Sequence, residues 1–197
     1  MPFLDPNTPV PAGLRTDDFV LRPILASDAE RDHAAVMDTR DELRLWEQTS
    51  WPEDDFTVEA NRADLEDLDR RHSERRAFTY TVLDPAGAEA LGCVYVFPID
   101  ATFLTKAEVS PRSDDRWEHF DAVVYFWVRP SRADVGMHRD LLAALRTWFA
   151  GEWGFERTGY VTSERYVRQV DLLEGDGLTV RFELREPGKP GAYLVFG

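Results

Sequence analysis

A buried strand that runs into a glycine-containing turn and then a helix can bind an anion. In this sequence an apolar run ends at Val128, Gly136 follows in the turn, and Met137 and His138 open an amphipathic stretch. The first N–H groups of a helix have no intrahelical acceptor and carry a partial positive charge, so they can hydrogen-bond a phosphate. A glycine in the turn has no side chain, so a phosphate can approach the backbone closely. The same pattern also fits an ordinary strand-to-helix turn, and both interpretations stay open.

A second segment, 46–56, combines aromatic rings with acidic side chains. Trp46, Trp51 and acids such as Glu53 could hold an organic cation through ring faces and negative charge. The alternative is structural, with the tryptophans packed in the core and the neighbouring aspartates capping a helix.

The composition fits one acidic domain. The chain has 197 residues, a hydrophobic fraction of 43% and a formal net charge of -14. A nucleic-acid-binding surface needs clustered Lys and Arg to neutralise phosphates, so we exclude nucleic acid as a partner. An acidic surface can attract cationic substrates, and it also keeps a protein soluble.

Cysteine content and hydropathy exclude further classes of site. Cys93 is the single cysteine, so we expect no intrachain disulfide and no metal. It lies in an apolar run, which predicts a core residue rather than a nucleophile. No stretch approaches the roughly 18 apolar residues of a membrane span, and the first six residues lack a signal pattern. We therefore expect a cytoplasmic protein without a membrane partner.

Changes in hydrophobic period locate the elements that hold these segments. Residues 1–17 are rich in Pro, Asn, Thr and Gly and predict an N-terminal arm, which leaves 18–197 as the domain. We expect strands at 19–25, 78–83, 91–99, 122–128, 159–162, 178–184 and 192–196, and helices from 27, at 57–76, after 136 and at 166–174.

This order predicts an α/β fold, a mixed sheet with helices on its faces. The Ser27-x-x-Glu30 spacing predicts a capping box at the first helix. Residues 101–120 show no period and predict an exposed excursion. The C-terminal hairpin offers an edge at which a homodimer could form.

The segment Phe126–Pro130 followed by Val135–Leu142 resembles the central strand, pyrophosphate loop and third helix of the GNAT superfamily. These proteins are acyl-CoA-dependent N-acyltransferases, and the element order across 18–197 is similar to theirs. The resemblance implies a single GNAT-like acyltransferase domain of about seven mixed strands flanked by about four helices.

The loop keeps one of the family's three signature positions. The family pattern is Arg/Gln-x-x-Gly-x-Gly/Ala, and here it falls on Ala133, Gly136 and His138. Arg132 precedes and Arg139 follows these positions, and either could supply the missing charge. The His138 side chain could cap a phosphate as imidazolium, block its approach, or face solvent.

The resemblance also implies acetyl-CoA as co-substrate. Main-chain groups of the central strand would meet the pantetheine arm, and amides of the loop would meet the pyrophosphate. The implied cofactor-binding residues are Phe126, Trp127, Val128, Arg132, Val135, Gly136, Met137, His138 and Arg139. The family places the acceptor beside the connection between its first two helices, which assigns Trp46, Trp51 and Glu53 to the acceptor.

Acyl transfer requires an unprotonated amine, because an alkylammonium ion with a pKa near 10.4 is less than about 0.1% free base at neutral pH. Family members often carry a glutamate near Val123 and a tyrosine near Leu173, and neither residue here can exchange a proton. We take Asp121, on the same side of the strand as Val123, as the candidate base. Tyr166 is the candidate proton donor. A surface charge and a packing aromatic are the alternatives.

Two functions follow from these residues. The first is an N-acetyltransferase that acts on an amine of a small molecule or on an amino terminus. The second is a GNAT-fold protein without catalysis, serving as a binding or regulatory module or as an acyl-CoA sensor. The departures from the loop pattern favour the second, and the retained Gly136 and neighbouring arginines favour the first.

Overall fold

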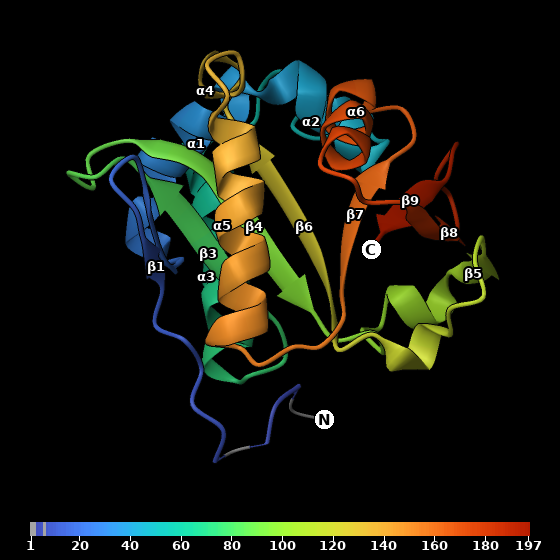
Figure 1. Cartoon of the computed structure of the whole chain (residues 1–197). Coiled ribbons are helices and arrows are strands. Elements are labelled where there is room, and N and C mark those ends of the chain that lie inside the picture. The colour runs from blue at the N-terminus through green and yellow to red at the C-terminus, as the bar shows by residue number, and fades with distance from the viewer. Residues whose placement is uncertain (1–2, 6) are drawn as a thin grey trace.

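A nine-stranded mixed sheet forms the centre of the computed structural model, which describes residues 3–5 and 7–197 (Figure 1). The strand order is β1-β2-β3-β4-β6-β7-β9-β8-β5. The strands are β1 (Leu14–Arg15), β2 (Val20–Pro23), β3 (Phe78–Leu83), β4 (Ala90–Phe97), β5 (Glu108–Pro111), β6 (Ala122–Val128), β7 (Thr158–Ser163), β8 (Val180–Arg185) and β9 (Tyr193–Phe196).

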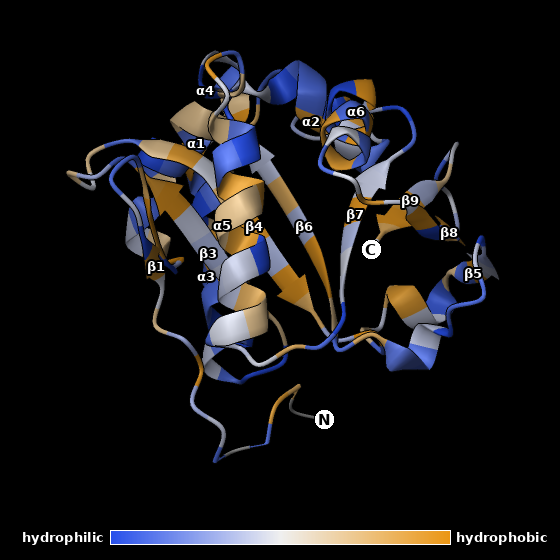
Figure 2. Cartoon of the chain, in the orientation of Figure 1, coloured by the Kyte–Doolittle hydropathy of each residue, from blue (hydrophilic) through white to orange (hydrophobic). Residues whose placement is uncertain are grey.

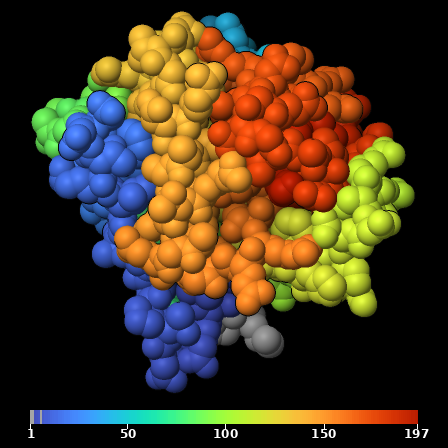
Figure 3. Space-filling model, viewed as in Figure 1, coloured from blue at the N-terminus to red at the C-terminus, as the bar shows by residue number. Residues whose placement is uncertain are grey.

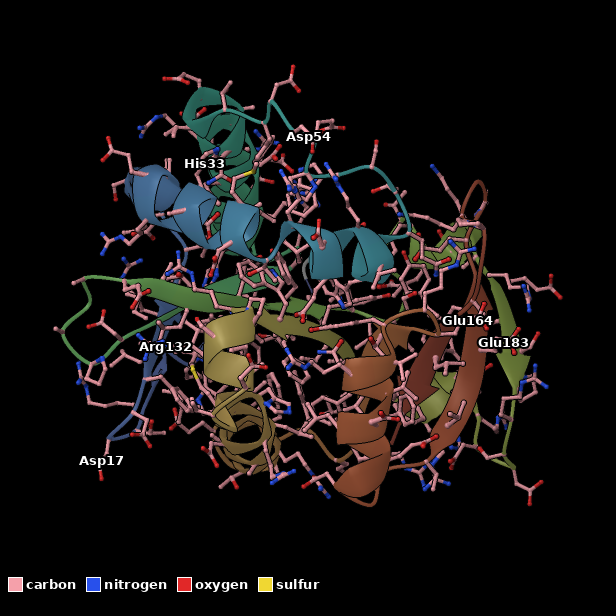
Figure 4. The ribbon with its side chains drawn as sticks, turned by 90° about the horizontal axis from the view of Figure 1, so that it is seen from above. Asp17, His33, Asp54, Arg132, Glu164 and Glu183 are labelled. Atoms are coloured by element: carbon pink, nitrogen blue, oxygen red, sulfur yellow. The ribbon has the colours of Figure 1, made fainter. Side chains whose placement is uncertain are left out.

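Helices cover both faces of this sheet. Seen from above, α1, α2 and α3 lie on one side of it, and α4, α5 and α6 lie on the other (Figure 4). The helices are α1 (Ala29–Asp38), α2 (Arg40–Glu47), α3 (Val58–Ser73), α4 (Pro130–Ala133), α5 (Met137–Gly151) and α6 (Val167–Gly175), with short 3-10 turns at Ala26–Asp28, Leu104–Lys106 and Trp117–His119. None of the described helices is both long and apolar enough to cross a membrane.

The predicted α/β architecture is confirmed, and two central strands have the predicted bounds. The predicted strands 78–83 and 122–128 are β3 and β6, and every residue of both is buried. Each face of the sheet carries its own core, because alternate side chains of β6 point to opposite faces. The hydropathy colouring shows the corresponding apolar stripe on α5 (Figure 2). Cys93 is buried in the core, as expected.

Three local predictions are wrong. The predicted helix from residue 27 is two helices, because the chain leaves helical geometry at Thr39, whose hydroxyl bonds the Ala35 carbonyl at 2.8 Å. The capping box at Ser27 is replaced by Asp28, whose carboxylate accepts the Leu25 N–H at 3.0 Å. The excursion 101–120 contains β5.

The N-terminal segment packs against the sheet, and β5 forms one of its edges. Phe3 contacts Phe78 with ring centroids 5.7 Å apart, and the Tyr80 hydroxyl donates to the Pro11 carbonyl at 2.7 Å, so the predicted arm lies on the domain. Strand β5 pairs with β8, so β5 and not the C-terminal hairpin forms that edge of the sheet. The homodimer stays a prediction.

Strands β6 and β7 part halfway along their length. β6 and β7 are the parallel pair of the sheet, and their register covers only Ala122–Val124 of β6 against Thr158–Tyr160 of β7. Beyond Val124 the strands separate, and Figure 1 shows the space between β6 and β7 widening toward α4 and α6. The candidate site lies where they part.

Candidate functional site

Two cavities lie back to back at the parting of β6 and β7. Tyr125 and Phe126 are neighbours on β6, so their side chains point to opposite faces of the sheet. Tyr125 lines a cavity on the α1–α3 face, and Phe126 lines one on the α5–α6 face. We call them the aromatic pocket and the slot.

The slot is nearly filled by side chains. Its volume is about 10 Å³, room for about one water molecule. In the space-filling view the α4–α5 region and the α6 region touch along the visible face (Figure 3). The slot is lined by Phe126, Val128, Ala133, His138, Tyr166, Arg168, Gln169 and Leu172.

Gln169 is the residue that closes the slot. Its side chain is 4% exposed, and its Nε2 donates to the Phe126 carbonyl at 2.7 Å. That carbonyl belongs to the stretch of β6 expected to meet a pantetheine arm, so the amide of Gln169 holds an acceptor that such a ligand would need. Gln169 was not among the predicted residues, because a polar residue on a short helix gives no sign of a partner 43 positions away.

Tyr166 lies beside the slot but directs its hydroxyl elsewhere. The hydroxyl donates to Glu42 Oε2 on α2 at 2.7 Å, and the Arg168 guanidinium bonds the other oxygen of Glu42 at 3.0 Å. Arg168 also pairs with Asp134. Burial, reinforced by the bond to Glu42, raises the pKa of the Tyr166 phenol well above its ordinary value. The phenol is therefore neutral and engaged.

The turn before α5 keeps the geometry of an anion site. Gly136 has φ 94°, in the left-handed region that favours glycine, and caps the helix. Its carbonyl accepts the N–H groups of Arg139 at 2.9 Å and Asp140 at 3.3 Å. No described carbonyl accepts the N–H of Met137 or His138 outside the helix, so these two amides are available to a phosphate.

The His138 side chain is a poor phosphate cap. Burial lowers the pKa of the imidazole, and the nearby Arg168 and Arg139 lower it further, so the ring is neutral at pH 7. Its Nδ1 is buried without a hydrogen-bond partner among the described atoms. The imidazolium interpretation is therefore disfavoured, and the ring instead narrows the slot.

The arginines near the loop divide into two groups. Arg132 bonds Glu89 at 2.7 Å together with Arg129, so its charge is held toward the β3–β4 turn (Figure 4). Arg139 is exposed and has no ion pair in the described chain, and Arg168 lies close enough to act on His138. Arg139 and Arg168 both act electrostatically on the side chain of His138, whose amide is one of the two free ones, and sequence reasoning missed Arg168 because it lies on another helix.

The remaining predicted loop residues occupy distinct environments. Val135 is 77% exposed, and the Met137 side chain is buried in the core under α5. The Trp127 indole points to the opposite face and donates to the Tyr95 hydroxyl at 3.3 Å. Only the main chain of Trp127 can face the slot.

The aromatic pocket, with a volume of about 340 Å³, lies under the connection that follows α2. Figure 4 places that connection, marked by Asp54, over the α1–α3 face. The pocket is lined by Trp46, Glu47, Trp51, Asp64, Leu68, Tyr95, Phe97, Phe103, Tyr125, Glu186 and Tyr193. Of the three residues predicted for the acceptor, Trp46 and Trp51 line this pocket, whereas Glu53 is exposed and is not part of the lining.

Tyr125 is the centre of a continuous set of ring contacts. Its ring lies 5.9 Å from those of Trp46 and Phe97, 6.1 Å from Phe103 and 6.5 Å from Tyr193, between centroids. All four contacts are edge-to-face, an arrangement that aromatic pairs prefer. The rings of the wall therefore support one another and offer several aromatic groups to a ligand.

The acids of the pocket exceed its bases. Glu47 pairs with Lys189 at 3.3 Å, and the Lys189 ammonium also bonds the Glu47 carbonyl. Glu186 and Asp64 have no ion pair in the described structure, and Asp64 stands exposed at the rim. Burial raises the pKa of Glu186, Lys189 opposes this, and Glu47 adds to it. The pocket thus presents an uncompensated, partly buried carboxylate.

Asp121 does not join either cavity. It precedes β6, at the end of that strand away from Gly136, and its Oδ2 accepts the N–H groups of Glu156 at 2.7 Å and Arg157 at 2.9 Å. These bonds hold the β6–β7 connection. In the described part of the chain, no three or more His, Cys, Asp or Glu side chains lie close enough together to hold a metal ion.

Comparison with known proteins gives a fold and no close relative. No protein-family model and no curated protein matches the sequence. Among solved structures, a ribosomal-protein-S5-alanine acetyltransferase from Vibrio fischeri has a TM-score of 0.67 at 18% identity, covering 94% of this chain and 95% of its own.

Two further matches are ligand complexes. The RimL ribosomal-protein α-N-acetyltransferase with coenzyme A has a TM-score of 0.65 at 16% identity over 95% of each chain. The microcin self-immunity acetyltransferase MccE with acetyl-CoA and AMP has a TM-score of 0.66 at 13% identity, covering 96% of this chain and 97% of its own. The TM-scores establish a shared fold, that of the GNAT acetyltransferases, and at identities this low they establish the fold alone.

Proposed function

We propose that this chain, which has the GNAT acetyltransferase fold, is an acyl-CoA-dependent N-acetyltransferase acting on the amine of a small molecule. The observation that carries the proposal is the pair of cavities on opposite faces of β6, at the point where it leaves β7. An acyl donor threaded from the α5–α6 face and an amine seated on the α1–α3 face would meet in the gap between β6 and β7, beside Tyr125 and Phe126.

The loop residues fit the phosphates of acetyl-CoA, which when bound supplies the activated acetyl group. The free N–H groups of Met137 and His138 and the side chains of Arg139 and Arg168 would hold the pyrophosphate. Main-chain groups of Phe126, Trp127 and Val128 would hold the pantetheine arm once Gln169 leaves the Phe126 carbonyl.

Glu186 is the carboxylate that we propose as proton acceptor for the amine. It lines the aromatic pocket and has no ion pair in the described structure, and its raised pKa makes it a stronger base than an ordinary glutamate. Asp121 and Tyr166 stay predictions for the base and the proton donor. In this conformation Asp121 holds two backbone amides and Tyr166 holds Glu42.

We expect Glu186→Gln to lower kcat about a hundredfold with an amine acceptor, since general-base catalysis contributes roughly 10²–10⁴-fold. The measurement is steady-state kinetics against pH, because loss of the base should also flatten the acidic limb of the profile. Asp121→Asn is the comparison. If it removes that limb while Glu186→Gln does not, the sequence-predicted base is right and Glu186 is not the base.

A second function is favoured by Gln169. Its bond to the Phe126 carbonyl fills the slot with protein, as expected of a GNAT-fold protein that has lost its acyl donor and binds a ligand only in the aromatic pocket.

Gln169→Ala should discriminate between the two functions. Removing the side chain frees the Phe126 carbonyl and the space beside it, so we expect about fivefold to tenfold tighter binding of coenzyme A, the equivalent of one hydrogen bond. Calorimetric titration of acetyl-CoA and free CoA into both proteins measures this. Gln48→Ala is the matched control, because Gln48 is also buried and bonds the Ala192 carbonyl at 3.1 Å, away from the slot.

Each outcome selects one function. Binding by the unmodified protein, strengthened in Gln169→Ala, supports acetyl transfer. Binding by Gln169→Ala alone supports the second function, with a slot that closed over a former donor site. No binding of acetyl-CoA or CoA to either protein at millimolar concentration overturns the transfer proposal.

A further inference from the structure

We infer that the aromatic pocket takes a single ammonium group carried on a compact apolar body, of the arylalkylamine class. This inference names the acceptor of the transfer proposed above and rests on that proposal for the chemistry. The binding itself depends only on the pocket. Four features of the pocket carry the inference.

The walls select an apolar body. Seven aromatic side chains line the pocket, and they come from four separate parts of the chain. The parts contribute Trp46 with Trp51; Tyr95 with Phe97 and Phe103; Tyr125; and Tyr193. Ring faces attract a cation by roughly 0.5–2 kcal/mol, more where water is excluded, and they also bury aromatic or aliphatic groups of a ligand. A body with many hydroxyl or amide groups would leave those groups without partners.

The inner charge selects one cation. The negative charges of Glu186 and Glu47 both raise the pKa of the Tyr125 phenol and of the Tyr193 phenol. The two carboxylates therefore lie at the same end of the pocket. Lys189 compensates one of them, since it bonds Glu47 and lies 6.0 Å from the Tyr193 ring centroid. One negative charge remains inside, and Asp64 stands at the rim, where water screens it.

Two buried polar atoms of the pocket lack a hydrogen-bond partner in the described structure. They are the Tyr125 hydroxyl and the Trp46 Nε1, and their side chains are 7% and 5% exposed. Both residues line the pocket. A buried polar group left unsatisfied costs about 1–3 kcal/mol, so a ligand that reaches either atom gains that energy.

The size excludes a folded protein or a long peptide. A volume of about 340 Å³ is near the lower end of the roughly 300–1,000 Å³ of small-molecule sites. An extended chain would also need free strand edges, and at Tyr95 and Tyr193 the strands β4 and β9 are each paired on both sides. The pocket therefore suits a small molecule better than an amino terminus of a protein.

The test measures binding without any acyl donor, so its failure is separate from failure of the transfer proposal. The probe is 2-phenylethylamine, followed by quenching of the fluorescence of Trp46 and Trp51 and by calorimetry. Its uncharged analogue 2-phenylethanol, the polyamine spermidine and the tripeptide Ala-Ala-Ala-amide serve as competing classes. The variants are Glu186→Gln and Tyr125→Phe, both close in shape to the original residues, with Trp51→Ala for the wall.

The matched control is Glu59→Gln. Glu59 is an exposed glutamate on α3 that does not line the pocket and has no ion pair in the described structure. We expect saturable binding of one 2-phenylethylamine per chain, weakened at least tenfold in Glu186→Gln and Trp51→Ala and unchanged in Glu59→Gln. Tyr125→Phe should change affinity less, through loss of one hydrogen bond.

Three results would overturn the inference. They are the absence of saturable binding at millimolar 2-phenylethylamine, equal binding of 2-phenylethanol, and tighter binding of spermidine or the tripeptide. If 2-phenylethylamine binds as expected while coenzyme A does not bind, the ligand class stands and the transfer proposal fails.

Discussion

Gly92→Ala is expected to destabilise the protein by about 3 kcal/mol or more, because there is no space for a methyl group at this position. A Cβ on Gly92 would lie 2.1 Å from the carbonyl oxygen of Trp127 and 3.1 Å from the Cα of Val128. These are backbone atoms of β6, which pairs with β4 through the Gly92–Val128 register. Relief of this clash would require β4 and β6 to move apart. Strand β6 also separates the slot from the aromatic pocket.

Urea unfolding followed by tryptophan fluorescence measures this loss. Gly151→Ala is the matched control, since Gly151 ends α5 and a Cβ there meets nothing within 4 Å. Alanine in a helix is favoured over glycine by about 0.5–1 kcal/mol, so the control should unfold at an equal or higher urea concentration. Equal urea midpoints for the two variants would contradict this prediction, because they would mean that β4 and β6 can separate enough to fit a methyl group at little cost.

The contribution of one buried carboxyl to the stability of the protein is expected to fall as the pH rises from about 4 to about 6. Asp32 on α1 is 3% exposed, and its Oδ2 accepts the Asn61 amide at 3.0 Å. Burial raises the pKa of Asp32 from 3.8 to about 6; Asp28 and Asp64 add to this, while the bond from Asn61 and the nearby His33 oppose it. At this group the folded state therefore holds a proton that the unfolded chain has released, and Asp32 contributes a negative slope of stability against pH across this window.

Asp32→Asn isolates this contribution, because the neutral amide can still accept from Asn61. A pKa difference of about two units corresponds to about 3 kcal/mol, which the unmodified protein forgoes above pH 6 and recovers below pH 4. The variant should therefore gain most over the unmodified protein at pH 7 and least at pH 4, measured by urea unfolding at each pH. A difference that does not change with pH would mean that Asp32 titrates normally.

Local sequence patterns located the central strands and the loop, because their signals are short-range. The run 122–128 is apolar throughout since both of its faces are covered, and Gly136 marks a left-handed turn that other residues disfavour. Strand β5 escaped prediction because it is an exposed edge strand of four residues, defined by pairing with β8 and not by its own period.

The residues of the proposed site depend on contacts between distant segments. Gln169 reaches Phe126, Tyr166 reaches Glu42 across 124 positions, and Glu186 joins a pocket whose tryptophans lie at the other end of the chain. The tryptophans were predicted because two rings beside acids form a local signal. Glu186 sits beside a Pro-Gly turn with no such signal, and only the packing of β9 against β7 brings it to the α2 connection.

The sharing of β6 by two cavities has a thermodynamic consequence. Tyr125 and Phe126 are consecutive residues, so a ligand that shifts the backbone on one face also shifts the wall of the cavity on the other. Any preference that an occupied slot creates for an amine must appear, by linkage, as an equal preference of the amine-loaded protein for the ligand of the slot. The two affinities cannot be tuned independently by changes to this strand, so selection on one cavity is also selection on the other.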